Sequence, residues 1–295
     1  MRDRSIRIRS FAKINLALAV LGKRPDGYHD IQTVFQSISI HDELEFRLSD
    51  RLELHCKNLP GVPKEDNLVW KAANMLTEAV SGRFGASIVL KKRIPSGAGL
   101  GGGSSNAAAT LLGLCRLWKI GIPEFDLQPL AAELGSDVPY FLSGGTAMGS
   151  GRGEKIHPLP DLPTRHLAVI FPGVQVPTVE AYRSLNLGLT SATEDNRIQC
   201  FCGQLKNDPS LLTGIFNDFE ASILPAYPPI LQAKNFLGRQ GAAVTLMSGS
   251  GSAVFGFFDD EESALAASRA KAREPWQVFP AKTLSSTEYS KSMFG

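Results

Sequence analysis

A glycine-rich segment at residues 95–110 (PSGAGLGGGSSNAAAT) constrains this chain more than any other feature. Five of the seven residues from 97 to 103 are glycine. The preceding residues 86–94 are rich in aliphatic and β-branched side chains and predict a strand. Residues 106–118 hold strong helix formers, with leucines at helical spacing, and predict a helix. A flexible linker would be polar on both sides, so the segment predicts a glycine-rich turn between a strand and a helix.

Such a turn directs backbone N–H groups and the positive end of a helix dipole toward an anion. A Walker A loop is excluded because glycine, not lysine, precedes Ser104. The spacing of Gly97, Gly99 and Gly102 matches the dinucleotide-binding pattern, but residues 119–126 contain no convincing second strand. A protein-kinase glycine loop joins two strands and is excluded too. The segment therefore predicts a phosphate-binding loop of another type.

Composition favours a soluble enzyme. The 295 residues are 43% hydrophobic and 20% charged, and the net charge of +2 gives no reason to expect a nucleic-acid or membrane partner. The sequence contains neither an apolar run long enough to span a membrane nor a signal peptide. The four cysteines suit a reduced compartment, and Cys200 and Cys202 have no second pair that would complete a zinc site. A cytoplasmic protein, monomeric or weakly dimeric, is expected.

The chain is long enough for two domains. Glycines at residues 144–153 and three prolines soon after them predict a boundary, which divides the chain into domains at 1–156 and 157–295. Adjacent strand pairs and helices in the second part predict an α+β domain. The expected strands there are residues 167–171, 242–247 and 253–258, and the expected helices are residues 179–185, 227–238 and 261–273.

Residues 10–20 alternate along a predicted strand. Ile14, Leu16, Leu18 and Val20 are expected on one face, with Lys13, Asn15, Ala17 and Ala19 on the other. A lysine and an asparagine beside small alanines suit a cleft, and they equally suit the edge of a sheet, where a lysine extends into solvent.

Two turns add further polar or aromatic candidates. The Pro-Asp-Gly turn at residues 25–27 brings Tyr28 and His29 to the start of a strand, where they could bind a base or simply pack at its end. Residues 248–252 (SGSGS) join two predicted strands, either as an ordinary hairpin turn or as a second backbone approach to a polar ligand.

Asp137 precedes Val138 and Pro139, so it could cap a short helix. It could equally be a carboxylate held beside the glycine-rich loop, where phosphoryl transfer needs a group that orients a hydroxyl.

These segments together resemble the GHMP kinases. The glycine-rich loop is a property of the whole family. A narrower resemblance, to the branch that phosphorylates 4-diphosphocytidyl-2-C-methyl-D-erythritol (CDP-methylerythritol), rests on further motifs: AKINL at 12–16, GKRPDGYH at 22–29, DNLV at 66–69, KAA at 71–73, LGSDVP at 134–139, PGV at 172–174, NDFE at 217–220 and SGSG at 248–251. The departures are Phe11, where proline is expected, and Asn106, where aspartate is common.

The resemblance implies an α+β fold with an N-terminal domain similar to the second domain of ribosomal protein S5 and a ferredoxin-like C-terminal domain. It also implies ATP-dependent phosphorylation of the 2-hydroxyl of CDP-methylerythritol, in the non-mevalonate route to isoprenoids. Lys13 and Asp137 become a catalytic pair in which the aspartate orients or deprotonates the hydroxyl. The lysine stabilises the anionic transition state and keeps the aspartate ionised.

The remaining site residues follow from the same resemblance. ATP is expected to bind the glycine-rich loop, with Asn67 and Lys92 near its adenine end, and the loop residues are Pro95, Gly97, Ala98, Gly99, Leu100, Gly101, Gly102, Gly103, Ser104 and Ser105. Mg²⁺ is expected with ATP, and Ser104 or Ser105 could be one of its ligands. Tyr28 and Tyr182 are expected to stack on the two faces of the cytosine, His29 to fix its edge and Asn15 to bind the methylerythritol.

Two alternative functions remain. One is another small-molecule kinase of the same family, acting on homoserine or mevalonate, which have no cytosine to stack. The other is a nucleotide-binding protein without catalysis, although the presence of Lys13, Asp137 and an intact loop argues against it.

Overall fold

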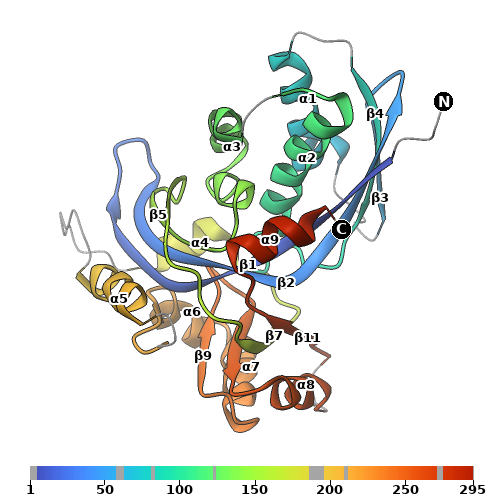
Figure 1. Ribbon diagram of the computed structural model, residues 1–295. Helices are drawn as coiled ribbons and strands as arrows, with labels where there is room; N and C mark the ends of the chain where they lie inside the picture. The colour runs from blue at the N-terminus through green and yellow to red at the C-terminus, as the bar shows by residue number, and fades with distance from the viewer. Residues whose placement is uncertain are drawn as a thin grey trace.

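The computed structural model describes most of the chain (Figure 1), and the described ranges are residues 5–57, 63–80, 84–121, 124–185, 196–208, 212–270 and 275–294. Two sheets organise it. The larger sheet has the order β3-β4-β2-β1-β8, with β5 and β6 added beside β2, and the smaller sheet has the order β11-β7-β10-β9. Helices and antiparallel strand pairs in both parts confirm the α+β class.

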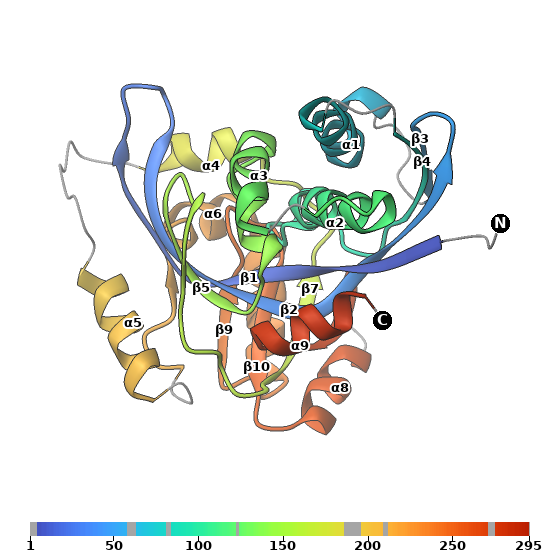
Figure 2. The same cartoon turned by 45° about the horizontal axis from the view of Figure 1, so that its top comes forward.

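The larger sheet is built around two long antiparallel strands, β1 (Ser5–Lys23) and β2 (His29–Ser49). Its other strands are β3 (Glu53–Lys57), β4 (Gly85–Lys91), β5 (Thr146–Gly151), β6 (Lys155–Pro158) and β8 (Phe216–Asn217). Helices α1 (Leu68–Ala79), α2 (Gly102–Trp118) and α3 (Gln128–Leu134) lie together on one side of this sheet (Figures 1 and 2). Three 3₁₀ turns, η1 (Lys64–Asp66), η2 (Glu124–Leu127) and η3 (Pro139–Leu142), connect these elements.

The smaller sheet lies on the opposite side of β1 and β2 from these helices (Figures 1 and 2). Its strands are β7 (His166–Phe171), β9 (Val244–Met247), β10 (Val254–Phe258) and β11 (Gln277–Lys282). The helices of this part are α4 (Thr178–Ser184), α5 (Asn196–Asn207), α6 (Glu220–Ala226), α7 (Pro228–Arg239) and α8 (Glu261–Arg269). Helix α9 (Ser286–Met293) then returns to β1.

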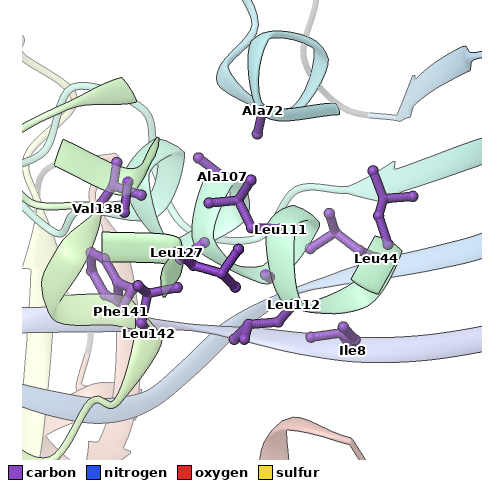
Figure 3. Packing of buried hydrophobic residues seen from close by; sticks show 14 of the residues in the cluster. Ile8, Leu44, Ala72, Ala107, Leu111, Leu112, Leu127, Val138, Phe141 and Leu142 are labelled. Carbon is purple, nitrogen blue, oxygen red and sulfur yellow. The ribbon is translucent and has the colours of Figure 1, made fainter. Parts of the chain in front are cut away.

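The core beneath α1 and α2 explains why α2 holds so many small residues. Helix α2 is buried over nearly its whole length, and Ala107, Leu111 and Leu112 lie among side chains from the sheet, from α1 and from η3 (Figure 3). A Cβ atom on Gly113 would lie 2.7 Å from the ring of Phe46, so only glycine lets the helix approach the sheet this closely.

The predicted strands and helices are all present in the part of the chain that the structure describes. Helix α2 begins at Gly102, four residues earlier than predicted, because the glycines themselves form its first turn. Helix α8 ends at Arg269, and residues 271–273 of its predicted range lie outside the described residues. Within residues 119–126, where no strand was expected, residues 122 and 123 also lie outside the described residues.

The predicted alternation along β1 is wrong beyond Leu16. A β-bulge between Asn15 and Ala17 inserts one residue, which shifts the period-two pattern. Ile14 and Leu16 therefore share a buried cluster with Ala17 and Ala19, whereas Leu18 and Val20 belong to another cluster against α6 and α7. Lys13 and Asn15 do share a face, since their side chains are hydrogen bonded.

Two segments from late in the chain join the larger sheet. Strand β8 pairs with β1 in parallel. On α9, Tyr289 and Met293 belong to the same core as α2. Residue 156, at the predicted domain boundary, lies within β6, and the boundary stays a prediction. Among the described residues, no helix is long and apolar enough to cross a membrane.

Candidate active site

The glycine-rich loop lies between β4 and the first turn of α2 (Figure 1). Gly97, Gly99 and Gly101 have φ values of 68°, 76° and 68°, in the left-handed region that favours glycine. A Cβ atom on Gly99 would lie 2.1 Å from the backbone oxygen of Ser248. The loop is therefore a surface of main-chain atoms beside the N-terminus of a helix, the geometry that binds phosphate groups.

The SGSGS segment at 248–252 is both a hairpin turn and a contact with this loop. It joins β9 to β10. The Ser248 hydroxyl donates to the carbonyl of Gly99 at 2.9 Å, and the N–H of Ala253 donates to the carbonyl of Ala98 at 3.0 Å. The side-chain amide of Asn217, at the end of β8, donates to the carbonyls of Met247 and Gly249, both at 2.8 Å. The smaller sheet thus holds the loop in place.

A cavity of about 340 Å³ opens beside the loop. It is lined by the predicted ATP-binding residues, namely Pro95, Gly97, Ala98, Gly99, Leu100, Gly101, Gly102, Gly103, Ser104, Asn67 and Lys92. Ser96, Asp66 and Asn106 also line it and were not predicted. Ser105 does not: it is buried, and its hydroxyl accepts a hydrogen bond of 2.8 Å from Ser10. The dimensions suit part of a nucleotide.

Lys92 enters this cavity already paired with Asp42. The lysine ammonium is hydrogen bonded to the fully buried carboxylate of Asp42, which also accepts hydrogen bonds from the N–H groups of Arg93 and Ile94. This pair fixes the lysine in position. Nothing in the local sequence distinguishes Asp42 from the other charged residues in the second half of β2, so sequence reasoning missed it.

Asn67 has a structural role in the protein itself. Its side-chain oxygen accepts a hydrogen bond of 2.9 Å from the N–H of Val69, so it caps α1. Its amide nitrogen lies 3.3 Å from the sulfur of Cys56. The side chain therefore stands at the cavity wall in a single orientation.

Lys13 and Asp137, 124 positions apart in the chain, meet at the other end of the loop. The Lys13 ammonium lies 3.5 Å from the Asp137 carboxylate. The lysine side chain is 4% exposed and the aspartate side chain 31%, so a ligand can reach the carboxylate. The N–H of Lys13 donates to the carbonyl of Leu100 at 3.0 Å, which ties the pair to the glycine-rich loop.

The environment of Lys13 lowers its pKa. Burial disfavours the charged ammonium and is the largest influence, while the charge and hydrogen bond of Asp137 oppose it. The ammonium also donates to the side-chain oxygen of Asn15 at 2.7 Å, and the Asn15 amide donates to Thr33. The Lys13 ammonium is thus held by the side-chain oxygen of Asn15 and the carboxylate of Asp137.

Asp137 does not cap η3. Val138 occupies the N-cap position, and no side chain caps that turn. Instead η3 is fixed by hydroxyl groups: Tyr140 contacts Ser37 and the carbonyl of Gly145, both at 2.7 Å, and Tyr289 of α9 donates to the carbonyl of Phe141 at 2.7 Å. The turn that carries the carboxylate is therefore rigid on its buried side.

Aromatic side chains complete the site. The rings of His29 and Tyr182 are stacked, with centroids 4.5 Å apart, and Tyr182 meets Phe219 edge-on. Burial, helped by the nearby charge of Asp137, raises the pKa of Tyr182 to about 12. Burial and the charge of Lys23 lower the pKa of His29. Tyr28 is 55% exposed. The ring that stacks on Tyr182 in this structure is thus that of His29. The three residues predicted to bind the base, Tyr28, His29 and Tyr182, lie at one end of the site.

The described residues contain no cluster of three or more His, Cys, Asp or Glu side chains arranged to hold a metal ion. Of the two predicted serine ligands, Ser104 is the one at the cavity, in the first turn of α2. A magnesium ion bound through ATP phosphates needs few protein ligands, so these residues are compatible with one.

Two family matches agree with this geometry. Residues 67–145 match the N-terminal domain of GHMP kinases, and residues 205–275 match the C-terminal domain of GHMP kinases. A crystal structure of a homoserine kinase from Cytophaga hutchinsonii has the same fold, with a TM-score of 0.71 at 21% identity over 96% of this chain and 98% of that one. Fold and site together define a GHMP-type small-molecule kinase.

More similar proteins narrow the class. A 4-diphosphocytidyl-2-C-methyl-D-erythritol kinase from Solibacter usitatus is 43% identical over 88% of this chain and 83% of its own length. The corresponding kinase from Chlorobium phaeobacteroides is 42% identical over 90% and 93%. A crystal structure of a 4-(cytidine 5'-diphospho)-2C-methyl-D-erythritol kinase has a TM-score of 0.77 at 34% identity, over 94% of this chain and 99% of that one. The chain belongs to this kinase family.

Proposed function

We propose that this chain transfers the γ-phosphoryl group of ATP to the 2-hydroxyl of CDP-methylerythritol, forming the 2-phosphate and ADP in the non-mevalonate route to isoprenoids. The observation that carries the proposal is the Lys13–Asp137 pair, at 3.5 Å, tied through Leu100 to a loop whose main chain faces an open cavity. Such a site brings together a phosphate-binding surface, a carboxylate and a cation, which phosphoryl transfer requires.

Each member of the pair has a separate task. The Asp137 carboxylate accepts a hydrogen bond from the substrate hydroxyl and orients its oxygen toward the phosphorus. The Lys13 ammonium lies beside both and stabilises the negative charge that develops on the transferred group. Because Lys13 is almost fully buried, this charge acts where solvent screens it little.

The loop and its neighbours position ATP. Main-chain N–H groups of residues 99–104 and the N-terminus of α2 are expected to bind the phosphates, and Lys92 and Asn67, which line the same cavity, are expected near the adenine. Ser104 is the residue that we expect to contact Mg²⁺. The ion would neutralise charge on the phosphates.

The aromatic end binds the cytidine. Tyr28, which is 55% exposed, offers a face on which a cytosine can stack. His29 covers one face of Tyr182, so a cytosine that stacks there must displace the His29 ring, whose nitrogens can then bind the edge of the base. Asn15, fixed between Lys13 and Thr33, lies where it can bind the methylerythritol.

An ADP-release assay with ATP and Mg²⁺ tests the proposal, with CDP-methylerythritol, homoserine and mevalonate as parallel acceptors. We expect turnover with CDP-methylerythritol alone. Asp137→Asn keeps the shape but removes the charge, and we expect turnover to fall by roughly 10²–10⁴-fold. The exposed Asp259, in the turn after β10, provides the matched control Asp259→Asn.

Other outcomes distinguish the alternatives. Turnover with homoserine or mevalonate would keep the fold and overturn the substrate. ATP binding without ADP release, for all three acceptors, would indicate a nucleotide-binding protein without catalysis.

A further inference from the structure

The turn between β5 and β6 carries an arginine that no motif singled out. Gly151, the last residue of β5, pairs with Ile31 of β2. The turn at residues 151–154 therefore lies beside the hairpin that joins β1 to β2 and carries Tyr28, as Figures 1 and 2 both show. Gly151 and Gly153 have positive φ values of 73° and 107°, so glycine is required on both sides of Arg152.

Arg152 is built into the rim of the site. Its guanidinium carbon lies 5.0 Å from the centroid of the Tyr28 ring, a cation–π contact. The N–H of Arg152 donates to Glu154 at 2.6 Å, which fixes the backbone of the turn. The guanidinium itself lies 3.9 Å from Glu154, beyond hydrogen-bond length, and the side chain is 30% exposed. Its donors can therefore reach a ligand.

The next residue of the turn approaches the opposite end of the site. A Cβ atom on Gly153 would lie 3.8 Å from a carboxylate oxygen of Asp137. Arg152 thus stands between Tyr28, on which the base is proposed to stack, and Asp137, which is proposed to orient the reacting hydroxyl. In CDP-methylerythritol the group between the base with its ribose and the hydroxyl is a diphosphate.

Acidic side chains surround Arg152, and two of them are already paired with other cations: Asp137 with Lys13 and Asp26 with Arg24. Asp137, Glu154 and Asp26 all lie near Arg152. The pKa of Asp26 is lowered chiefly by its hydrogen bond from Arg24, and the charge of Arg152 adds a small contribution in the same direction. Asp26 is also paired with Arg24 at 3.0 Å. A diphosphate brought close to these carboxylates would be repelled unless a positive charge lay between them. A guanidinium matches phosphate oxygens in a bidentate geometry.

We propose that Arg152 binds the diphosphate of the cytidyl substrate and so sets the distance between the base and the reacting hydroxyl. This inference rests on the proposed function. It makes Arg152 a specificity-determining residue, because homoserine and mevalonate carry no diphosphate.

Calorimetric titration with CDP and with cytidine tests the proposal, since only CDP carries the phosphates. We expect Arg152→Met to weaken CDP binding roughly ten- to hundredfold, as for loss of a charged hydrogen-bonding partner, and to leave cytidine binding within about twofold. In the assay, the KM for CDP-methylerythritol should rise and the KM for ATP should not. The exposed Lys155, at the start of β6, provides the control Lys155→Met, which removes the same charge without either effect.

Two results would overturn the proposal. Equal weakening of CDP and cytidine binding would mean that Arg152 acts only by holding Tyr28. Unchanged binding of both would mean that it has no role in recognition. Failure of the proposed function has a different signature, because the wild-type chain would then release no ADP with CDP-methylerythritol, whatever the titrations show.

Discussion

At the scale of single residues, the site depends on a buried lysine that stability alone would not favour. The Lys13 side chain is 4% exposed, and the net effect of its surroundings is to lower its pKa. Burying an ammonium costs free energy that a partly exposed partner such as Asp137 recovers only in part. Stability alone therefore does not account for this buried charge, whereas the proposed role in stabilising a transferred phosphoryl group does.

Lys13→Met tests this explanation through the pH dependence of stability. The lowered pKa means that the unfolded chain binds this proton more tightly than the folded chain does. The free energy of unfolding of the wild type therefore increases as pH rises from the pKa of Lys13 in the folded chain toward its ordinary value of 10.5. A methionine does not titrate, so the variant lacks this increase. Urea denaturation of both proteins near pH 7 and near pH 10 measures it.

We expect the wild type to gain stability relative to Lys13→Met between the two pH values, while the variant loses turnover by about a hundredfold or more. A stability difference that stays constant with pH would contradict the assigned effect of burial. Titrating groups that do not contact residue 13 contribute equally in both proteins, so their contributions cancel in the comparison.

At the scale of elements, the conformation of the glycine-rich loop depends on both sheets. Its own glycines permit the backbone conformation, but the hairpin at 248–252 and Asn217 of β8 hold it there. The β-bulge in β1 also affects the site, because it changes which residues share a face of the strand. Lys13 and Asn15, before the bulge, share one face, whereas Leu18 and Val20, after it, pack against α6 and α7.

Two alanine substitutions separate backbone requirement from helix propensity. In Gly99→Ala the new Cβ would lie 2.1 Å from the carbonyl oxygen of Ser248, on a residue with positive φ. We expect a loss of about 2–4 kcal/mol in the free energy of unfolding. In Gly103→Ala the nearest side-chain atom, on Leu68, is 3.5 Å away, and the residue lies in α2. We expect that variant to change stability by no more than about 1 kcal/mol, and in the stabilising direction.

Chemical denaturation followed by circular dichroism gives both values. Similar losses in the two variants would show that the loop tolerates a side chain at neither position, and that the contact with the hairpin is not what restricts Gly99.

At the scale of the whole molecule, the two sheets are not independent. Tyr289 and Met293 of α9 complete the core around α2, and β8 completes the edge of the larger sheet at β1. Both come from beyond residue 156. A chain divided there would lose buried apolar contacts and a strand from the first part.

The fragment of residues 1–156 should therefore not fold by itself. We expect it to show no cooperative unfolding transition and to bind ATP only when residues 157–295 are supplied as a second fragment, whereas the full chain should unfold in one step by fluorescence and circular dichroism alike. A fragment that unfolds cooperatively alone would establish the boundary at 156 as that of an autonomous domain.

The sequence by itself determined whatever depends on neighbouring residues. Five glycines between a β-branched run and a run of helix formers specify a glycine-rich turn between a strand and a helix, since backbone conformation and periodicity are local properties. The α+β class followed from the same reasoning. The motifs from residue 12 to residue 251 identified the family, which the relatives at 42% and 43% identity confirm.

Only the tertiary structure decided which polar groups meet. Local sequence left a structural interpretation open for Lys13 and for Asp137, and their pairing was expected only from the family resemblance; the structure gives the distance between them, 3.5 Å. Neither the Asp42 partner of Lys92 nor the place of Arg152 beside Tyr28 left a local signal. The bulge that reverses the faces of β1 was equally invisible. The physical reason is the same in each case: pairing of charges and register of strands are energies between segments far apart in the chain, and a sequence pattern records only the preferences of each segment by itself.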